Sequence, residues 1–143
     1  MMLPVWMLVG FAAWTVLLLL GTVGVYRWSR ILTGRVAIRD FRADQIEGAD
    51  WYKRAMRAHA NCAENLPVFG AIVLGLYVGN VASPLVNALA VAILAARILQ
   101  SLVHVCFAQT NIVTSVRFGF FFVQIVSFLW LTGILLTTLS GSV

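Results

Sequence analysis

Charged and amide side chains recur at helical spacing just before Pro67. The members of this first stripe are Arg54, Arg57, Asn61 and Glu64. Their intervals of three, four and three residues place them on one face of a helix. No charged residue follows Glu64 until Arg97, and a carboxylate so deep in an apolar segment needs a partner or a water-filled cavity. The pattern therefore predicts a polar helix face that binds charged groups, whereas Lys53 and Arg54 alone would equally fit a solvated helix end.

A second polar stripe follows later in the chain. Arg97, Gln100 and His104 are three and four residues apart, so they share a helix face. If the two helices are joined by a turn near residue 82, Glu64 and Arg97 lie at similar depth and we expect them to form a charge pair. Such a pair could simply fix helix packing. The alternative interpretation is a polar seam, entered from the cytoplasm, that binds a polar anionic ligand.

Helices in a membrane must position these stripes. The chain is 62% hydrophobic and only 10% charged, whereas a water-soluble domain carries about a quarter charged residues. Spanning a hydrocarbon core of about 30 Å takes about 20 apolar residues as a helix. Unbroken apolar runs exclude the alternating pattern of a barrel. The sequence predicts an all-α integral membrane four-helix bundle in a single domain, residues 1–143. Its helices lie near 4–27, 51–79, 84–108 and 113–139, and a loop lies near 28–50.

The distribution of positive charge predicts the topology. Eight of the ten Lys and Arg residues lie between the first two helices: Arg27, Arg30, Arg35, Arg39, Arg42, Lys53, Arg54 and Arg57. This loop should be cytoplasmic, with both termini on the opposite side of a bacterial inner membrane or an equivalent one. The arginines after the first helix favour a retained anchor over a cleaved signal peptide. Membrane lipids with anionic headgroups explain the net charge of +5, and we expect no nucleic-acid partner.

The two cysteines indicate no special chemistry. Cys62 and Cys106 lie in or next to apolar helices without CxxC or Cys/His spacing. We therefore expect buried free thiols, no disulfide framework and no metal site.

The first polar stripe is part of a longer motif. The stretch Arg57-Ala-His-Ala-Asn61-Cys-Ala-Glu64-Asn-Leu-Pro67-Val-Phe69 resembles the signature Arg-x-x-x-Asn-x-x-Glu-x-x-Pro of the MAPEG family, the membrane-associated proteins in eicosanoid and glutathione metabolism. The resemblance implies a homotrimer of four-helix subunits that bind glutathione, as co-substrate, between adjacent subunits near the cytoplasmic side. The family includes microsomal glutathione transferases, prostaglandin E and leukotriene synthases, and a non-enzymatic lipoxygenase-activating protein.

The resemblance also implies roles for individual residues. Arg57, Asn61 and Glu64 match the glutathione contacts of the second helix, and Arg97 matches the third-helix arginine that pairs with the glutamate. Arg27 or Arg30 matches a basic contact from the end of the first helix. Gln100 and His104 stand where many members have His or Tyr and then Tyr. They can still bind a peptide ligand by hydrogen bonds, with a different geometry.

The fourth helix departs from the pattern of catalytic members. Those members carry an arginine near its start that holds the glutathione thiolate, whereas the matching position here is Asn111 or Thr114. Arg117 could replace the missing cation in a shifted register, so Arg117 and Asn111 are the candidate catalytic residues. A neutral side chain would lower the thiol pKa less than a cation would.

Three functions are consistent with these residues. The first is a glutathione-dependent transferase or peroxidase acting on lipophilic electrophiles or lipid hydroperoxides. The second is a non-catalytic MAPEG-like scaffold that binds a lipid or another ligand. The third is a small transporter or channel subunit, although the chain lacks the repeated halves usual in transporters.

Overall fold

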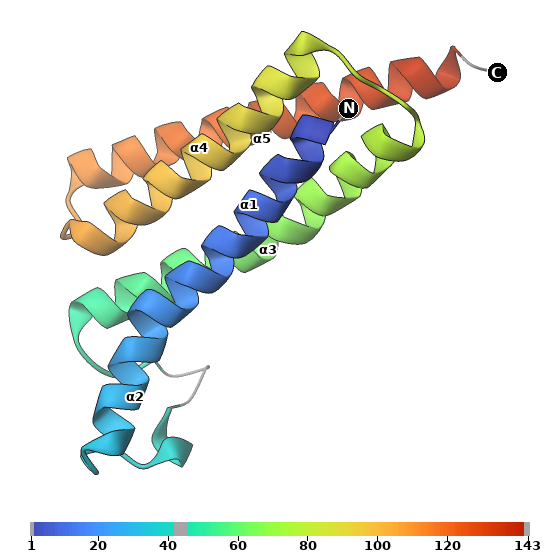
Figure 1. The fold of residues 1–143 in the computed structure, drawn as a ribbon. Helices are drawn as coiled ribbons and strands as arrows, with labels where there is room; N and C mark the ends of the chain where they lie inside the picture. Colours follow the sequence, from blue (N-terminus) through green and yellow to red (C-terminus); the bar gives the residue numbers. More distant parts are fainter. Residues whose placement is uncertain (1, 42–45, 142–143) are drawn as a thin grey trace.

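The structure is a computed structural model that describes residues 2–41 and 46–141, so Arg42 of the basic loop lies outside the described residues. All its regular elements in those ranges are helical (Figure 1). In chain order they are α1 (Met2–Leu18), the π-helical turn η1 (Leu19–Gly24), α2 (Val25–Leu32), the 3-10 turn η2 (Ile38–Asp40), α3 (Asp50–Val78), α4 (Pro84–Cys106) and α5 (Asn111–Ser140).

Four of the helical segments in this part of the chain are long and apolar enough to cross a membrane. They are Leu3–Leu32, Asp50–Val78, Pro84–Cys106 and Asn111–Thr138. The all-α membrane architecture predicted from the sequence is therefore confirmed. The predicted end of the first membrane-spanning helix was wrong, because helical structure continues to Leu32 instead of stopping near residue 27. Its arginines continue the helix because they pack on aromatic rings, as Arg30 does over Tyr26 at 4.6 Å.

The turn between α3 and α4 lies where the sequence predicted it. Asn80, the second residue after α3, adopts a positive φ of 53°, a conformation that asparagine tolerates well. Ser83 then caps α4, because its Oγ accepts a hydrogen bond from the Val86 N–H at 3.2 Å. Pro84 occupies the first helical position, where its missing N–H costs nothing.

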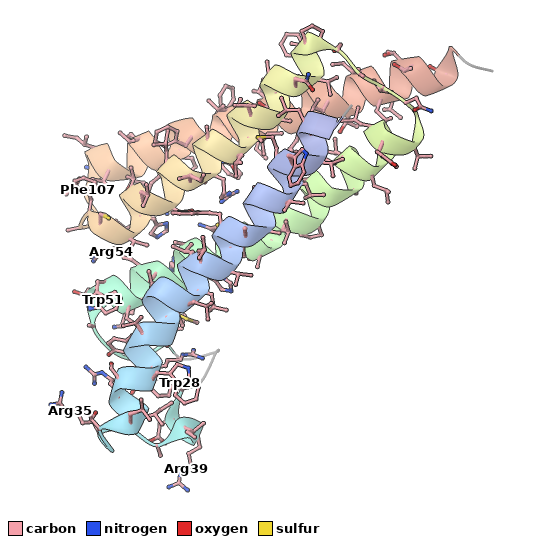
Figure 2. All side chains as sticks on the ribbon, viewed as in Figure 1. Trp28, Arg35, Arg39, Trp51, Arg54 and Phe107 are labelled. Atoms are coloured by element: carbon pink, nitrogen blue, oxygen red, sulfur yellow. The ribbon has the colours of Figure 1, made fainter. Side chains whose placement is uncertain are left out.

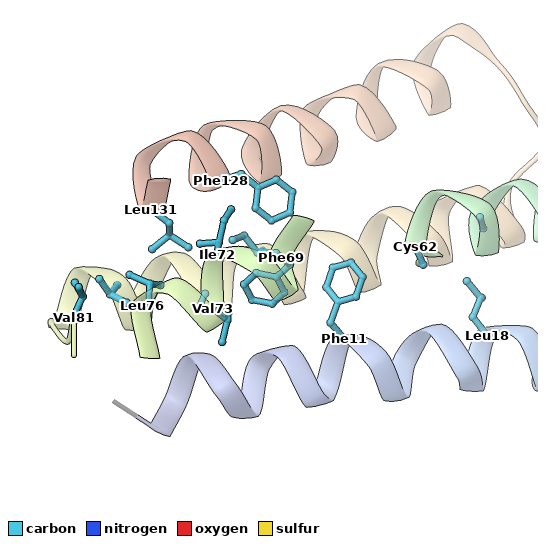
Figure 3. Packing of buried hydrophobic residues seen from close by; sticks show 14 residues of the cluster. Phe11, Leu18, Cys62, Phe69, Ile72, Val73, Leu76, Val81, Phe128 and Leu131 are labelled. Atoms are coloured by element: carbon cyan, nitrogen blue, oxygen red, sulfur yellow. The ribbon is translucent and has the colours of Figure 1, made fainter. Parts of the chain in front are cut away.

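The bundle packs through aromatic rings and close helix contacts. α5 lies along α4, while α1 packs against both α3 and α4. Phe69 of α3 lies at the centre, 5.7 Å from the ring of Phe11 and 6.1 Å from that of Phe128 (Figure 3). Gly75 allows α5 to approach α3, since a Cβ there would lie 2.6 Å from Leu135 Cδ2. Small residues at such contacts are typical of membrane helices, which associate through packing.

The π-helical turn η1 changes which face of the first helix points inward. Leu18 is buried, and the next buried residue is Val23, five positions later, followed by Tyr26. A π turn adds one residue to the helical repeat, so every later side chain is rotated relative to α1. As a result, Tyr26 stacks on Tyr52 of α3 at 4.1 Å, and Arg27 Nε donates a hydrogen bond to Tyr52 Oη at 2.8 Å.

Candidate functional site

The polar stripe of α4 faces the interior of the helical bundle. Arg97 is only 1% exposed, and Gln100 and His104 are also buried. The buried hydroxyl of Ser101, on the same helix, donates a hydrogen bond to the Arg97 carbonyl at 2.8 Å, so its donor is satisfied within α4. The three residues that the sequence grouped by spacing therefore do share one buried face. Polar groups inside a membrane bundle are costly and usually functional.

The charge pair predicted between Glu64 and Arg97 does not form within the chain. Glu64 is exposed, and the only ion pair in residues 2–41 and 46–141 joins Arg39 to Asp40. Arg97 instead lies over the Phe11 ring at 5.6 Å, and its buried Nε and Nη2 have no hydrogen-bond partner. The physical reason is helix rotation. The small side chain of Cys62 faces α4, and Glu64, two residues on, points about 200° away around α3.

Gln100 connects α4 to α5. Its Nε2 donates to the Arg117 carbonyl at 3.1 Å, and its Oε1 accepts from Gln124 Nε2 at 3.0 Å. Gln124 is fully buried and was missed in the sequence. A signal was present, because Gln124 is a lone amide seven residues after Arg117 in an apolar helix, and this interval is two helical turns. These hydrogen bonds fix the position of Arg117 relative to α4.

A strongly cationic pocket opens between the start of α3 and the end of α4. It has a volume of about 630 Å³, and its lining residues are Asp50, Lys53, Arg54, Arg57, His104, Ala108 and Gln109. Three cationic side chains and a single carboxylate therefore line it. Figure 2 shows Arg54 at this end of α3, close to the end of α4, where its Nη2 donates to the Val105 carbonyl at 3.5 Å.

The positive charges of this region outnumber the single carboxylate of Asp50. Arg117, Arg57 and Arg54 all lie within electrostatic range of His104, and Arg57 lies within range of Arg117. In the described chain none of these arginines has a carboxylate within 4.0 Å. The Nδ1 atom of His104 is buried without a hydrogen-bond partner. Such a cluster favours an anion, because only an opposite charge relieves the repulsion among the cations.

Arg117 lies in a smaller pocket that opens on the exposed side of α5. Thr114 and Gln100 provide its other polar side chains, and Phe118 and Phe121 its apolar wall, around about 200 Å³. The Nε of Arg117 is buried there without a partner. Asn111 is exposed at the start of α5 and does not line this pocket. Of the two candidate catalytic residues, Arg117 therefore borders this pocket and Asn111 does not.

Comparison with known proteins gives one informative match. A model of the MAPEG family matches residues 4–137, nearly the whole chain. The chain belongs to the MAPEG family. No curated protein and no solved structure matches it. Together with the four candidate membrane spans, membership makes this an integral, multi-pass membrane protein.

Two arginines predicted to contact glutathione are engaged elsewhere in this MAPEG chain. Arg27 bonds to Tyr52 and lies 5.3 Å from the centroid of the Phe41 ring. Arg30 borders a separate hollow of about 400 Å³ beside α2. Neither lines the cationic pocket. Asn61 is half-buried, and its backbone carbonyl accepts from Asn65 Nδ2 at 3.0 Å.

Both cysteines of the MAPEG chain are free, as expected. Cys62 is buried, with its Sγ 3.4 Å from Ser101 Oγ. The expectation of burial was wrong for Cys106, which is exposed at the last residue of α4.

Proposed function

We propose that this MAPEG protein binds glutathione in the cationic pocket and uses the bound thiolate against lipophilic substrates. The observation that carries the proposal is the excess of positive charge in this pocket, where Lys53, Arg54 and Arg57 face one carboxylate, Asp50, and neither arginine is ion-paired within the described residues. Glutathione is a peptide with two carboxylates, an ammonium group and a thiol. Guanidinium groups suit its carboxylates because they donate paired hydrogen bonds.

The chemistry depends on supplying a thiolate. Cations near the bound sulfur lower the pKa of the thiol. Arg117 lines the neighbouring pocket, but it is the candidate because its Nε has no partner and it lies within electrostatic range of Arg57, which lines the cationic pocket. In the transferase reaction the thiolate forms a carbon–sulfur bond, and the electron pair leaves with the displaced group or settles on the electrophile. In a peroxidase reaction two glutathione molecules become a disulfide while the hydroperoxide becomes an alcohol and water. Phe118 and Phe121 give a lipophilic substrate access from the bilayer.

A second subunit would complete the site. Arg57 and Glu64 are exposed on α3 although α3 is a membrane span. A carboxylate facing lipid is costly, so this face suits another copy of the chain. We propose the homotrimer that the family resemblance implies, with the pocket on the cytoplasmic side and glutathione held between subunits. Glu64 and Asn61 would then meet the ammonium or amide groups of the ligand.

A non-catalytic scaffold is the second candidate. By the family resemblance, Asn111 or Thr114 stands where catalytic members carry the arginine that holds the thiolate, and Asn111 is exposed. Gln100 is also occupied within the chain by Gln124 and the Arg117 carbonyl. If Arg117 does not replace the missing cation, glutathione or another anionic ligand would bind without being activated.

Binding is tested with Arg57. Arg57→Ala should weaken glutathione binding by about 1.5 to 3 kcal/mol, or roughly 10- to 150-fold, since it removes hydrogen bonds to a charged group. Isothermal titration of the solubilised protein measures this, with Arg57→Lys as the control that keeps the charge. Binding that is unchanged in Arg57→Ala would remove the cationic pocket as the glutathione site.

Activation is tested with Arg117. The ultraviolet absorbance of glutathione thiolate, titrated against pH, should show ionisation near neutral pH in the wild type and at clearly higher pH in Arg117→Gln. Arg117→Lys should retain most of the effect because it keeps the cation. Glutathione that binds but never ionises near neutral pH in the wild type would decide for the scaffold.

A further inference from the structure

α2, the C-terminal part of the first membrane span, carries an apolar stripe that no other part of the described chain covers. Val25, Trp28 and Leu32 are spaced three and four residues apart and are 59%, 60% and 78% exposed. Figure 1 shows that α2 extends past the start of α3 and the end of α4. The continuous helical span Leu3–Leu32 has 30 residues, which at 1.5 Å each is about 45 Å, longer than a hydrocarbon core of about 30 Å. One end of it must therefore reach into the headgroup layer.

Arginines lie directly beyond this stripe. Figure 2 shows Arg35 and Arg39 pointing away from the bundle at the end of α2, with Trp28 on α2 itself. The Arg39 side chain is 90% exposed, and its contact with Asp40 spans 3.9 Å. An exposed pair of this length contributes little, so it leaves Arg39 available to another anion. Arg30, in contrast, is held over the Tyr26 ring.

We infer that α2 and the residues after it form a docking surface for anionic phospholipid headgroups, separate from the glutathione pocket. The named surface comprises Val25, Trp28, Leu32, Arg35 and Arg39, and we refer to it as the α2 foot. Its apolar residues enter the membrane interface, where tryptophan is favoured. Its arginines, which follow α2 in the connection to η2 and in η2 itself, then meet headgroup phosphates, and two cations distinguish an anionic lipid from a zwitterionic one.

This surface has a structural consequence for the neighbouring pocket. Tyr26 and Arg27, on the opposite side of α2, pack against Tyr52 at the start of α3. Lys53 and Arg54, which line the cationic pocket, follow Tyr52 directly. Lipid bound at the α2 foot would therefore fix the position of α2, which packs against the start of α3 beside Lys53 and Arg54 of the cationic pocket.

The test compares two lipids. Protein in a neutral detergent is titrated with phosphatidylglycerol or phosphatidylcholine, and bound lipids are counted by native mass spectrometry. Each arginine should favour the anionic lipid by about fivefold. The wild type should therefore prefer phosphatidylglycerol by on the order of 25-fold, and Arg35→Gln/Arg39→Gln should lose that preference. Trp28→Ala should weaken both lipids by a similar factor.

A charge-matched control separates this surface from the glutathione pocket. Lys53→Gln/Arg54→Gln removes the same charge from the pocket and should keep the lipid preference while weakening glutathione binding. Thermal unfolding in the same detergent checks that each variant is folded. Equal binding of both lipids by the wild type, or a preference that survives Arg35→Gln/Arg39→Gln, would overturn the inference. Full competition by glycerol 3-phosphate would also overturn it, because a soluble phosphate site needs no bilayer.

Discussion

At the scale of single residues, Gln100 and Gln124 show how an apolar bundle accommodates amides. Each would be costly alone in a membrane helix, but together they join α4 to α5 through the 3.0 Å bond between Gln124 Nε2 and Gln100 Oε1. Gln124 Nε2 also donates to the Phe120 carbonyl at 3.0 Å. The pair fixes the relative rotation of the two helices and therefore where Arg117 points.

Replacing Gln100 should destabilise the protein. Gln100→Leu removes two hydrogen bonds, so it should lower the free energy of unfolding by about 1 to 3 kcal/mol. Thermal unfolding in detergent measures the loss. A double-mutant cycle with Gln124→Leu should give a coupling energy of at least about 0.5 kcal/mol, because the two side chains contact each other directly. Strictly additive losses would mean that the amide pair does not form.

At the scale of elements, η1 decides which residues of the first helix meet α3. Buried Val23 comes five positions after buried Leu18, one more than the four positions that a regular α-helix would give. This extra residue turns Tyr26 and Arg27 onto Tyr52 and leaves Trp28 and Leu32 facing outward. The π turn thus determines both the packing of α2 on Tyr52, beside the cationic pocket, and the orientation of the α2 foot.

Deleting one residue from η1 tests this role. Removal of the exposed Leu20 should convert the turn to regular α-helix and keep both flanking faces in register. The unfolding midpoint should therefore change by no more than about 4 °C, the shift expected for about 1 kcal/mol. Inserting one alanine after Gly21 rotates α2 by about 100° instead, so it should lower the midpoint by more. If the deletion is as harmful as the insertion, the register explanation fails.

At the scale of the whole molecule, a single subunit exposes polar groups that a membrane does not tolerate. Glu64 is exposed in a span whose other outward side chains include Val68 and Leu74. By contrast, the outward face of α1 is apolar, with Leu17 62% exposed. The two faces therefore suit different environments, a partner subunit for α3 and lipid for α1.

This contrast gives a prediction about assembly. The wild type in mild detergent should have three times the 15.7 kDa subunit mass after correction for bound detergent. Glu64→Trp should shift the population to smaller species, because a bulky ring would lie in the interface. Leu17→Trp should remain assembled, because its side chain faces lipid. A wild type found only as monomer or dimer would remove the shared-site proposal.

The amino-acid sequence by itself determined the four spans, the turn before Pro84 and the grouping of Arg97, Gln100 and His104 on one face. These features follow from local rules. Backbone N–H and C=O groups in lipid must form hydrogen bonds within a helix, and side chains three or four residues apart lie on the same helix face. The MAPEG motif was also readable from residue types and spacing alone, and the family match over residues 4–137 confirmed it.

Only the tertiary structure decided what each face meets. Arg97 points inward and Glu64 outward because the small Cys62 side of α3 packs toward α4. Matching depth along two helices says nothing about their rotation. In the same way, η1 shifts the first helix by one residue, and Gln124 acquires its role only where α5 lies along α4. Periodicity defines the faces of a helix, whereas the packing of side chains from distant segments selects the neighbour of each face.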